Sequence, residues 1–370
     1  MRGCAISSKR SFALSNDLGK VMTSEGRQDT REPALRPSLS EDPTLPARRR
    51  LPHCYFRHAG LWGSNDVPRW PKDDAEAFPR DANAAEEARA TITEYVRPLW
   101  GQSPGARTQG KLDDWPVVIV LNHTLPWFAP EIMRTRAGMC VADGGANRLH
   151  DDLPGLVRSL CPYMLEPDTT DAEILCMPEF RPDLIIGDLD SIRPDVRQFY
   201  SSLGVEVVDL AEDQDSTDLM KALRWLTGAG HVLPATTQVI ILGGLGGRLD
   251  HTMGNLNALY QYGGVVPGGI SLVSEHSAAI LLQPGLSHIL VNRAVEGPGC
   301  GLIPLGGPVE CCTTRGLQWD LSDAPMQFGG MVSTSNAFTS PVIAIHTDAP
   351  LLWTTNLKSR DEWKWDTTAS

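Results

Sequence analysis

Long apolar runs, a surplus of positive charge and C-x-x-C motifs are all missing from this 370-residue sequence. No apolar run reaches the roughly 18 residues that a membrane-spanning helix needs, so we expect no membrane segment. The 33 Lys and Arg residues are outnumbered by 45 Asp and Glu residues, and the formal net charge is −12. This charge, with no basic stripe, argues against a nucleic-acid partner held through phosphate contacts. A nucleotide ligand is still compatible, because local cations, backbone N–H groups and metal ions bind it.

The eight cysteines form no C-x-x-C motif, and the adjacent Cys311 and Cys312 have poor geometry for sharing a metal. We therefore expect reduced thiols in a cytoplasmic protein. The N-terminus lacks the apolar core of a secretory signal. It is mildly basic, but Asp17 and Glu25 dilute that charge and make it a weak mitochondrial presequence. Met22 is an alternative start site.

Residues 1–110 differ in composition from the rest of the chain. The stretch REPALRPSLSEDPTLPARRRLP is rich in Pro, Arg and Ser and has neither strand nor helix periodicity. One weakly amphipathic helix is expected over 82–95. We predict a largely disordered N-terminal extension with short elements that can dock on the body.

Between residues 111 and 266, strand-like apolar runs alternate with amphipathic helices. The expected strands lie at 117–122, 138–143, 182–190, 205–210 and 238–244, and the expected helices lie within 193–204, 216–228 and 250–262. This alternation predicts βαβ units and a Rossmann-like, mostly parallel sheet. Pro and acidic residues interrupt the alternation at 151–181, which we predict to be an insertion loop.

Residues 267–370 carry short β-type segments that are separated by turns rich in Gly, Pro and Asp. No long helical pattern occurs among them. This organisation predicts an all-β sandwich of jelly-roll type. The predicted fold is therefore an α/β domain followed by an all-β domain.

Polar clusters follow the predicted parallel strands. They are Asp143-Gly144-Gly145 after the second strand, Gly187-Asp188-Leu189-Asp190 after the third, 213–218 after the fourth and 243–250 after the fifth. In an open parallel sheet, loops and helix N-termini converge beyond the carboxyl ends of the strands, where ligands bind. Four such clusters along one edge predict a binding site.

The stretch PDLIIGDLDSI places Asp188 and Asp190 directly after a buried strand. Side chains two residues apart on an extended segment share one side, with Cα atoms roughly 6.5–7 Å apart, so both carboxylates can face one cation. Hard oxygen ligands without His or Cys indicate Mg²⁺, with Asp218 as a third ligand. The alternatives are a polar turn that ends the strand and, for Asp218, a first-turn acid favoured by the helix dipole.

The stretch GGLGGRLDH joins the fifth strand to a helix, so its backbone N–H groups can approach a polyphosphate. It matches neither G-x-x-x-x-G-K-[ST] nor the dinucleotide-binding pattern, and a tight turn also explains it. Arg248 adds a cation suited to phosphate. Lys221 is either a second phosphate contact or a solvated helix residue, and we assign no catalytic role to His251.

Several ordered motifs together resemble eukaryotic thiamine pyrophosphokinase. They are DGGANRL, PDLIIGDLDSIRP, DQDSTDLMKAL, LGGLGGRLDHTMGNLNAL, GCGLIPLG, TTRGLQWDL and GGMVSTSNAF, closing on DAPLLWTTNLK, and they span roughly 115–360. The resemblance implies an α/β nucleotide-binding domain, a β-sandwich domain and a homodimer with the thiamine pocket at its interface. It also implies transfer of the pyrophosphoryl group of ATP to the hydroxyl of thiamine, giving thiamine diphosphate and AMP.

The resemblance assigns roles to individual residues. It implies that Asp188, Asp190 and Asp218 bind Mg²⁺. It also assigns six residues to the segments that handle ATP: Asp143, Gln214, Thr217, Lys221, Arg248 and Asp250. Near thiamine it places Trp319, Ser333, Ser335 and Asn336, with Trp319 packing on the ligand through a face suited to a cationic ring. Without the resemblance, Trp319 would be interpreted as a core residue of the sandwich.

We expect catalysis to rest on positioning and charge neutralisation. Asp218 or Asp250 would accept the proton of the thiamine hydroxyl, and the sequence does not choose between them. Two alternatives stay open: a related pyrophosphotransferase acting on another alcohol, and a thiamine or nucleotide sensor without turnover.

Overall fold

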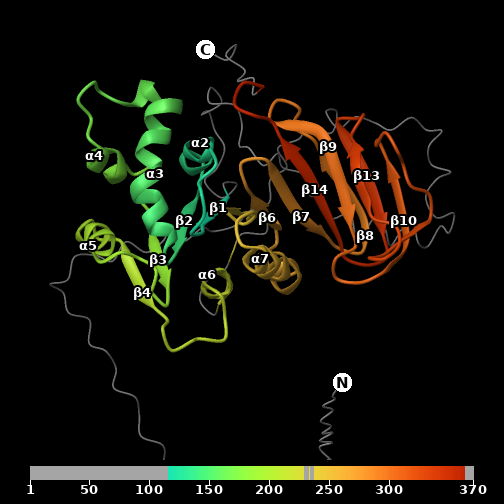
Figure 1. The fold of residues 1–370 in the computed structure, drawn as a ribbon, viewed down its shortest axis with the longest axis horizontal. Coiled ribbons are helices and arrows are strands. Elements are labelled where there is room, and N and C mark those ends of the chain that lie inside the picture. The colour runs from blue at the N-terminus through green and yellow to red at the C-terminus, as the bar shows by residue number, and fades with distance from the viewer. Residues whose placement is uncertain (1–115, 229–232, 234–236, 363–370) are drawn as a thin grey trace, which may run out of the picture. The chain divides into compact units, whose positions relative to one another are not determined.

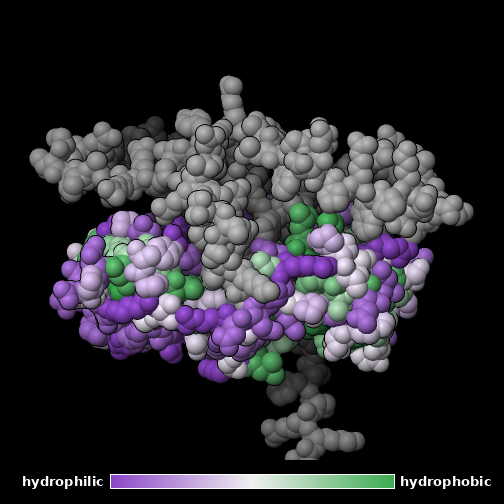
Figure 2. Space-filling view, turned by 90° about the horizontal axis from the view of Figure 1, so that it is seen from above, coloured by the Kyte–Doolittle hydropathy of each residue, from purple (hydrophilic) through white to green (hydrophobic). Residues whose placement is uncertain are grey.

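The computed structural model describes residues 116–228, 233 and 237–362. The predicted extension 1–110, with its helix over 82–95, lies outside these residues. Among the described helices, none has both the length and the apolar character needed to cross a bilayer. On the face drawn in Figure 2, hydrophilic residues dominate the described surface, and hydrophobic ones form small separate areas.

One sheet of ten strands runs through the described chain in the order β12-β9-β14-β7-β6-β5-β1-β2-β3-β4. Its parallel part consists of β1 (Val117–Val120), β2 (Gly138–Ala142), β3 (Leu184–Gly187), β4 (Glu206–Asp209), β5 (Val239–Leu242) and β6 (Ile270–Val273). The five strands expected between 117 and 244 are thereby confirmed. A sixth parallel strand, β6, follows the expected domain boundary at 266, so the sheet continues across it.

Helices cover both faces of the parallel strands (Figure 1). Alternate strand residues such as Val118 and Val120 share a core with α2 (Ala129–Arg134), α3 (Gly145–Leu160), α4 (Asp171–Cys176) and α5 (Pro194–Ser202). The intervening residues, such as Ile119, share a second core with α6 (Asp218–Thr227) and α7 (Leu249–Tyr262). Strands covered on both faces must be apolar at every position, which explains the continuous β-branched runs.

The prediction of a loop over 151–181 is wrong. Helix α3 runs through Pro154 to Leu160, a short 3₁₀ helix covers Pro162–Met164, and α4 follows with a capping box formed by Thr170 and Glu173. Leu153, Val157, Ile174 and Phe180, from this segment, are buried in the first core. The apolar spacing that fills this core outweighs the local cost of a proline inside the helix.

The C-terminal half of the described chain is antiparallel. It contains β7 (Ser277–Leu282), β8 (Gly285–Leu290), β9 (Glu296–Ile303), β10 (Val309–Arg315), β11 (Ala324–Met326), β12 (Ser333–Ala337), β13 (Val342–Thr347) and β14 (Leu351–Leu357). Strands β7, β14, β9 and β12 extend the large sheet, and β11-β10-β13-β8 form a second sheet. Leu302 and Trp353 of the large sheet pack with Cys312 and Ile345 of the second in one core. The predicted all-β sandwich is confirmed.

Candidate active site

The polar clusters predicted from the sequence lie at the ends of neighbouring parallel strands. Strand order places the glycine-rich loop after β5 beside the end of β1, which lies beside β2 and Asp143, then β3 and Asp188. Because these strands are parallel, all their carboxyl ends meet at one edge of the sheet. Asp218 joins this edge as the first residue of α6.

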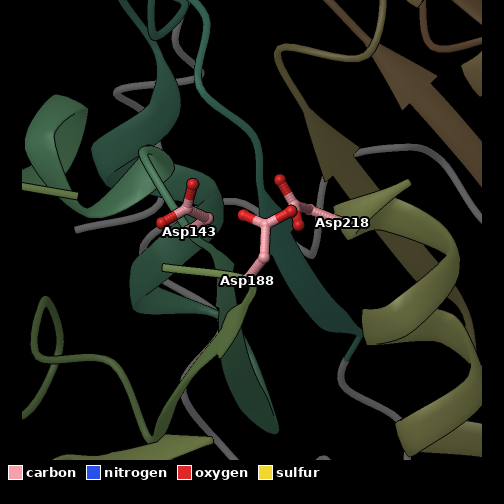
Figure 3. A group of neighbouring side chains, drawn as sticks. All are labelled: Asp143, Asp188 and Asp218. Carbon is pink, nitrogen blue, oxygen red and sulfur yellow. The ribbon is translucent and has the colours of Figure 1, made fainter. Parts of the chain in front are cut away.

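Three carboxylates converge there: Asp143, Asp188 and Asp218 each offer an oxygen, and these oxygens lie within 4.8 Å of one another (Figure 3). Gly187 makes this approach possible. A Cβ at Gly187 would lie 2.6 Å from the Asp143 Cβ and 3.0 Å from Oδ1 of Asp218. The glycine that precedes Asp188 in the sequence is therefore a space requirement of the acidic cluster.

Backbone groups fix Asp143 in this cluster. The residue is buried and has a φ of 37°, and its carboxylate accepts hydrogen bonds from the N–H groups of Ser191 (3.0 Å) and Ile192 (3.1 Å). These bonds tie the end of β2 to the segment after β3. Burial raises the pKa of Asp143, while the two N–H donors oppose that shift.

Lys221 balances the charge of the other two acids. Its side chain is 1% exposed, and Nζ lies 3.1 Å from Oδ2 of Asp188 and 3.4 Å from Oδ1 of Asp218. The interpretation of Lys221 as a solvated helix residue is therefore wrong. Burial would raise the pKa of Asp188, but the hydrogen bond and charge of Lys221 outweigh it and lower that pKa. Burial, followed by the charge of Asp188, raises the pKa of Asp218.

The donor set of this cluster fits a hard divalent cation. Three carboxylates with no His or Cys among them are typical of Mg²⁺, which also retains water and phosphate oxygens as ligands. The acidic cluster can therefore hold a metal ion.

Asp190 is not a member of this cluster. The expectation that it shares one side of an extended segment with Asp188 is wrong, because β3 ends at Gly187 and Leu189 has a φ of 60°. Asp190 is exposed and accepts a hydrogen bond from the hydroxyl of Ser191 at 2.8 Å. The left-handed turn at Leu189 redirects the chain, and Asp143 from the neighbouring strand lies beside Asp188 instead.

The loop between β5 and α7 has the backbone conformation that its glycines allow. Gly243, Gly246 and Gly247 have φ values of 78°, 99° and 68°, which non-glycine residues rarely adopt. Side chains of α7 hold two of its carbonyl oxygens: Asn255 donates to Gly244 O (2.9 Å) and Thr252 to Gly246 O (3.0 Å).

The backbone N–H groups of this loop and the side chain of Arg248 are the groups that could bind a ligand. Within the described part of the chain, the N–H groups of residues 244–247 donate no hydrogen bond to the protein. Arg248 is exposed and donates through Nε to Oδ1 of Asp250 at 3.1 Å. N–H groups that have no acceptor in the described protein, beside the guanidinium of an arginine, are suited to an anionic ligand.

The remaining residues predicted to handle ATP have local structural contacts. The Thr217 hydroxyl accepts a hydrogen bond from the N–H of Met220 (3.3 Å) and so caps α6. Gln214 donates to the carbonyl oxygen of Ala211 at 2.8 Å. These contacts position the start of α6, and with it Asp218.

Trp319 lies on the surface of the β region. It is 57% exposed, so the interpretation of Trp319 as a core residue is wrong. Asn336, which is buried, holds the tryptophan backbone: its Oδ1 accepts from Trp319 N (3.2 Å), and its Nδ2 donates to Trp319 O (2.9 Å). Ser333 accepts a further bond from Asn336, and Ser335 has a φ of 59°. The STSN segment therefore presents an indole to solvent.

Asn122 and His123 also lie at the site edge, directly after β1. Neither residue was predicted from the sequence, because neither is acidic or part of a glycine-rich cluster. The available signal was two polar residues at the end of an entirely apolar run, at the same edge as the other clusters.

Comparison with known families and proteins agrees with this arrangement. Residues 130–266 match the model for the thiamin pyrophosphokinase catalytic domain, and residues 287–352 match its vitamin B1 binding domain. Thiamine pyrophosphokinase 1 of Oryza sativa subsp. japonica is 42% identical over 245 residues, covering 65% of this chain and 87% of the relative. Thiamine pyrophosphokinase 1 of Arabidopsis thaliana is 40% identical over 243 residues, covering 65% and 86%.

The fold is similar to that of a solved relative. The crystal structure of yeast thiamin pyrophosphokinase superposes with a TM-score of 0.54 at 22% identity, covering 69% of this chain and 89% of the yeast chain. Both family models map onto the two regions described above, one on the parallel strands and one on the sandwich. The chain belongs to the thiamine pyrophosphokinase family.

Proposed function

We propose that this protein transfers the pyrophosphoryl group of ATP to the hydroxyl of thiamine and releases thiamine diphosphate and AMP. The observation that carries this proposal is the convergence of Asp143, Asp188 and Asp218 at one edge of the sheet. The cluster falls within the segment that matches the family's catalytic domain. Transfer of a charged group between oxygens depends mainly on positioning and charge neutralisation, which acids with a bound cation, cationic side chains and N–H donors supply.

Asp143, Asp188 and Asp218 are the residues that would hold Mg²⁺, and Asp190 remains a predicted ligand. Magnesium bound there would neutralise phosphate oxygens and orient the chain of ATP for in-line attack. Lys221, with its Nζ 3.1 Å from Asp188 and 3.4 Å from Asp218, favours the ionised form of these two acids. Negative charge develops on the departing AMP. It would be stabilised by the backbone N–H groups of 244–247 and the guanidinium of Arg248.

The acceptor hydroxyl must lose a proton as it attacks. Asp218 and Asp250 are the two candidates for this base. Asp218 contacts Lys221 within the cluster, whereas Asp250 is exposed and paired with Arg248. We propose that one of these carboxylates accepts the proton.

Thiamine would pack on Trp319. An exposed indole offers a large flat face to a cationic ring, and Asn336 fixes its backbone with two hydrogen bonds. Ser333 and Ser335 lie in the same segment and are the proposed polar contacts. We further propose a homodimer in which Trp319 of one subunit completes a site with the acidic cluster of the other.

Exposed apolar residues support this dimer. Besides Trp319, which follows β10, Phe328 is 61% and Met331 is 43% exposed, and both lie in the connection between β11 and β12. A second copy would bury them.

We place the reaction in the cytoplasm, because the six cysteines within the described residues are all free.

The direct test supplies purified protein with ATP, Mg²⁺ and thiamine and identifies products by chromatography. We expect thiamine diphosphate and AMP in equal amounts. ADP in place of AMP, or turnover only with another alcohol, would favour a different transferase. Absence of ATP consumption at saturating thiamine would favour a sensor.

The shared site has its own test. Asp188→Asn and Trp319→Ala subunits, each defective alone, are mixed and allowed to exchange. A site between subunits predicts recovered activity, because one site of each mixed dimer has both residues intact. No recovery after verified exchange would place both residues in the same subunit's site.

A further inference from the structure

His123 occupies the central position of the candidate active site. It follows β1, which is hydrogen-bonded to β5 on one side and β2 on the other. The glycine-rich loop extends from β5 and Asp143 follows β2. A phosphate chain that reaches from the loop to the acidic cluster must therefore pass the end of β1.

The ring of His123 lies against the glycine-rich loop. A Cβ at Gly247 would lie 2.8 Å from both Cδ2 and Nε2 of the ring, and one at Gly246 would lie 3.4 Å from Cε1. A Cβ at Gly243 would lie 3.0 Å from the Cβ of His123. The imidazole is thus packed beside the same N–H groups that are available to an anion.

The two polar residues after β1 differ in their protein contacts. Asn122 accepts a hydrogen bond from Nε of Arg148 at 3.3 Å. His123 is half-buried, and within 116–228 and 237–362 its ring nitrogens form no hydrogen bond or ion pair. A histidine ring held by packing, with its nitrogens unused by the described protein groups, can serve a ligand.

We propose that His123 donates a ring N–H to the phosphate chain of ATP between the glycine-rich loop and the acidic cluster. This proposal rests on the proposed function, because that function supplies ATP as the ligand. An imidazole N–H is a good donor to phosphate oxygen whether the ring is neutral or charged. His123 would hold the chain at the point where it crosses from backbone donors to the metal-binding acids.

The test compares His123→Gln, His123→Phe and His123→Ala by calorimetric titration with ATP in the presence of Mg²⁺. Glutamine retains an N–H donor, phenylalanine retains the ring that packs on the glycines, and alanine retains neither. We expect the Kd for ATP to rise roughly ten-fold to a hundred-fold in the Phe and Ala variants, as for a lost hydrogen bond to a charged group. The Gln variant should stay within a few-fold of wild type, and the KM for thiamine should not change.

The matched control is His346→Ala, which removes a histidine from β13 of the second sheet. It should bind ATP as wild type does. Wild-type affinity in His123→Phe would overturn the proposal. If His123→Ala is then impaired, the ring acts by packing on the glycines; if all three variants bind ATP normally, the ring has no role in binding. If His123→Ala fails to fold, the comparison of Gln with Phe still decides. Because the calorimetric titration uses ATP and Mg²⁺ without thiamine, its result stands even if the wild-type protein does not convert thiamine.

Discussion

The parallel and antiparallel halves of the ten-stranded sheet are joined by continuous hydrogen bonding, but they are covered by different elements and position functional side chains in different ways. The parallel strands are covered by helices on both faces, and their carboxyl ends bring Asp143, Asp188 and the glycine-rich loop to one edge. The antiparallel strands are covered by a second sheet, and their functional candidate, Trp319, lies in a connection held by Asn336. The parallel strands bring together polar groups from distant segments of the chain. The sandwich instead presents a single side chain, that of Trp319, whose backbone is held by hydrogen bonds to Asn336.

This difference assigns separate tasks to the halves. The parallel half would bind the charged co-substrate through acids, N–H groups and cations that only the strand order brings together. The antiparallel half would supply an aromatic surface that depends on nearby residues. Substitutions in each half should therefore affect different quantities.

The largest effect is expected from removing a charge in the parallel half. Asp188→Asn keeps the shape of the side chain but removes a metal ligand and the partner of Lys221, 3.1 Å away. We expect kcat to fall by about a thousand-fold or more, as for loss of a group that stabilises transferred phosphate. Steady-state kinetics with a circular dichroism check measures this. Asp190→Asn is the matched variant: a much smaller loss there would limit the ligands to the acidic cluster, and an equal loss would support Asp190 as a further ligand.

The helical cover of the parallel half should be the next most sensitive feature. Leu153 of α3 is completely buried in the first core. Leu153→Ala should lower the free energy of unfolding by about 2–5 kcal/mol, measured by urea denaturation. Glu166→Ala, an exposed change in the same segment, should alter it by less than about 0.5 kcal/mol. Equal, small effects would mean that 151–181 does behave as a dispensable loop.

The antiparallel half contains a buried acid whose titration should weaken it. Burial raises the pKa of Glu296 in β9 from 4.5 to about 7, although the N–H of Asn292 donates to it at 3.1 Å. The folded state thus holds the proton more tightly than the unfolded state. Its contribution to stability is full below pH 4.5 and is lost as the pH rises to about 7, a change of about 3 kcal/mol.

Glu296→Gln cannot ionise and should remove this loss. Urea denaturation of both proteins at pH 5 and pH 8 gives a double difference that cancels all other titrating groups. We expect the variant to gain stability relative to wild type at pH 8. An unchanged difference between the two pH values would show that Glu296 titrates normally.

The smallest effect should be confined to one substrate. Trp319→Ala removes an exposed indole without opening a core. The KM for thiamine should rise roughly ten-fold to a hundred-fold, the range of about 1.4–2.8 kcal/mol for a lost aromatic contact. The KM for ATP should not change. Trp319→Phe should retain part of the affinity, and a raised KM for ATP instead would break the separation of tasks between the two halves.

Much of the fold could be predicted because its signals are local. The β-branched runs in β1 and β5 and the apolar spacing of α6 are visible in any window of the sequence. Helix α3 was missed because Pro154 reads as a helix breaker, and only burial of Leu153 and Val157 against the sheet explains its continuation. The sixth parallel strand, β6, was assigned to the sandwich because a short apolar run does not reveal its pairing partner.

The site was predicted in outline, and one geometric expectation, that Asp188 and Asp190 share a side of an extended segment, was wrong. The edge of the sheet and the pairing of Asp188 with Asp218 follow from strand ends, and the structure brings them together. The position of Asp143, rather than Asp190, beside Asp188 depends on the left-handed backbone at Leu189 and the register of β2 with β3. Neither is encoded in a spacing of two residues. The burial of Lys221 likewise depends on tertiary contacts.

We propose that Asp143, Asp188 and Asp218 together hold the divalent cation. Titration of Mn²⁺, a spectroscopic substitute for Mg²⁺, into wild-type and Asp218→Asn protein by electron paramagnetic resonance tests it without relying on turnover. We expect a protein-bound ion in the wild type and at least about ten-fold weaker binding in the variant. Equal Mn²⁺ binding by the two proteins would contradict it.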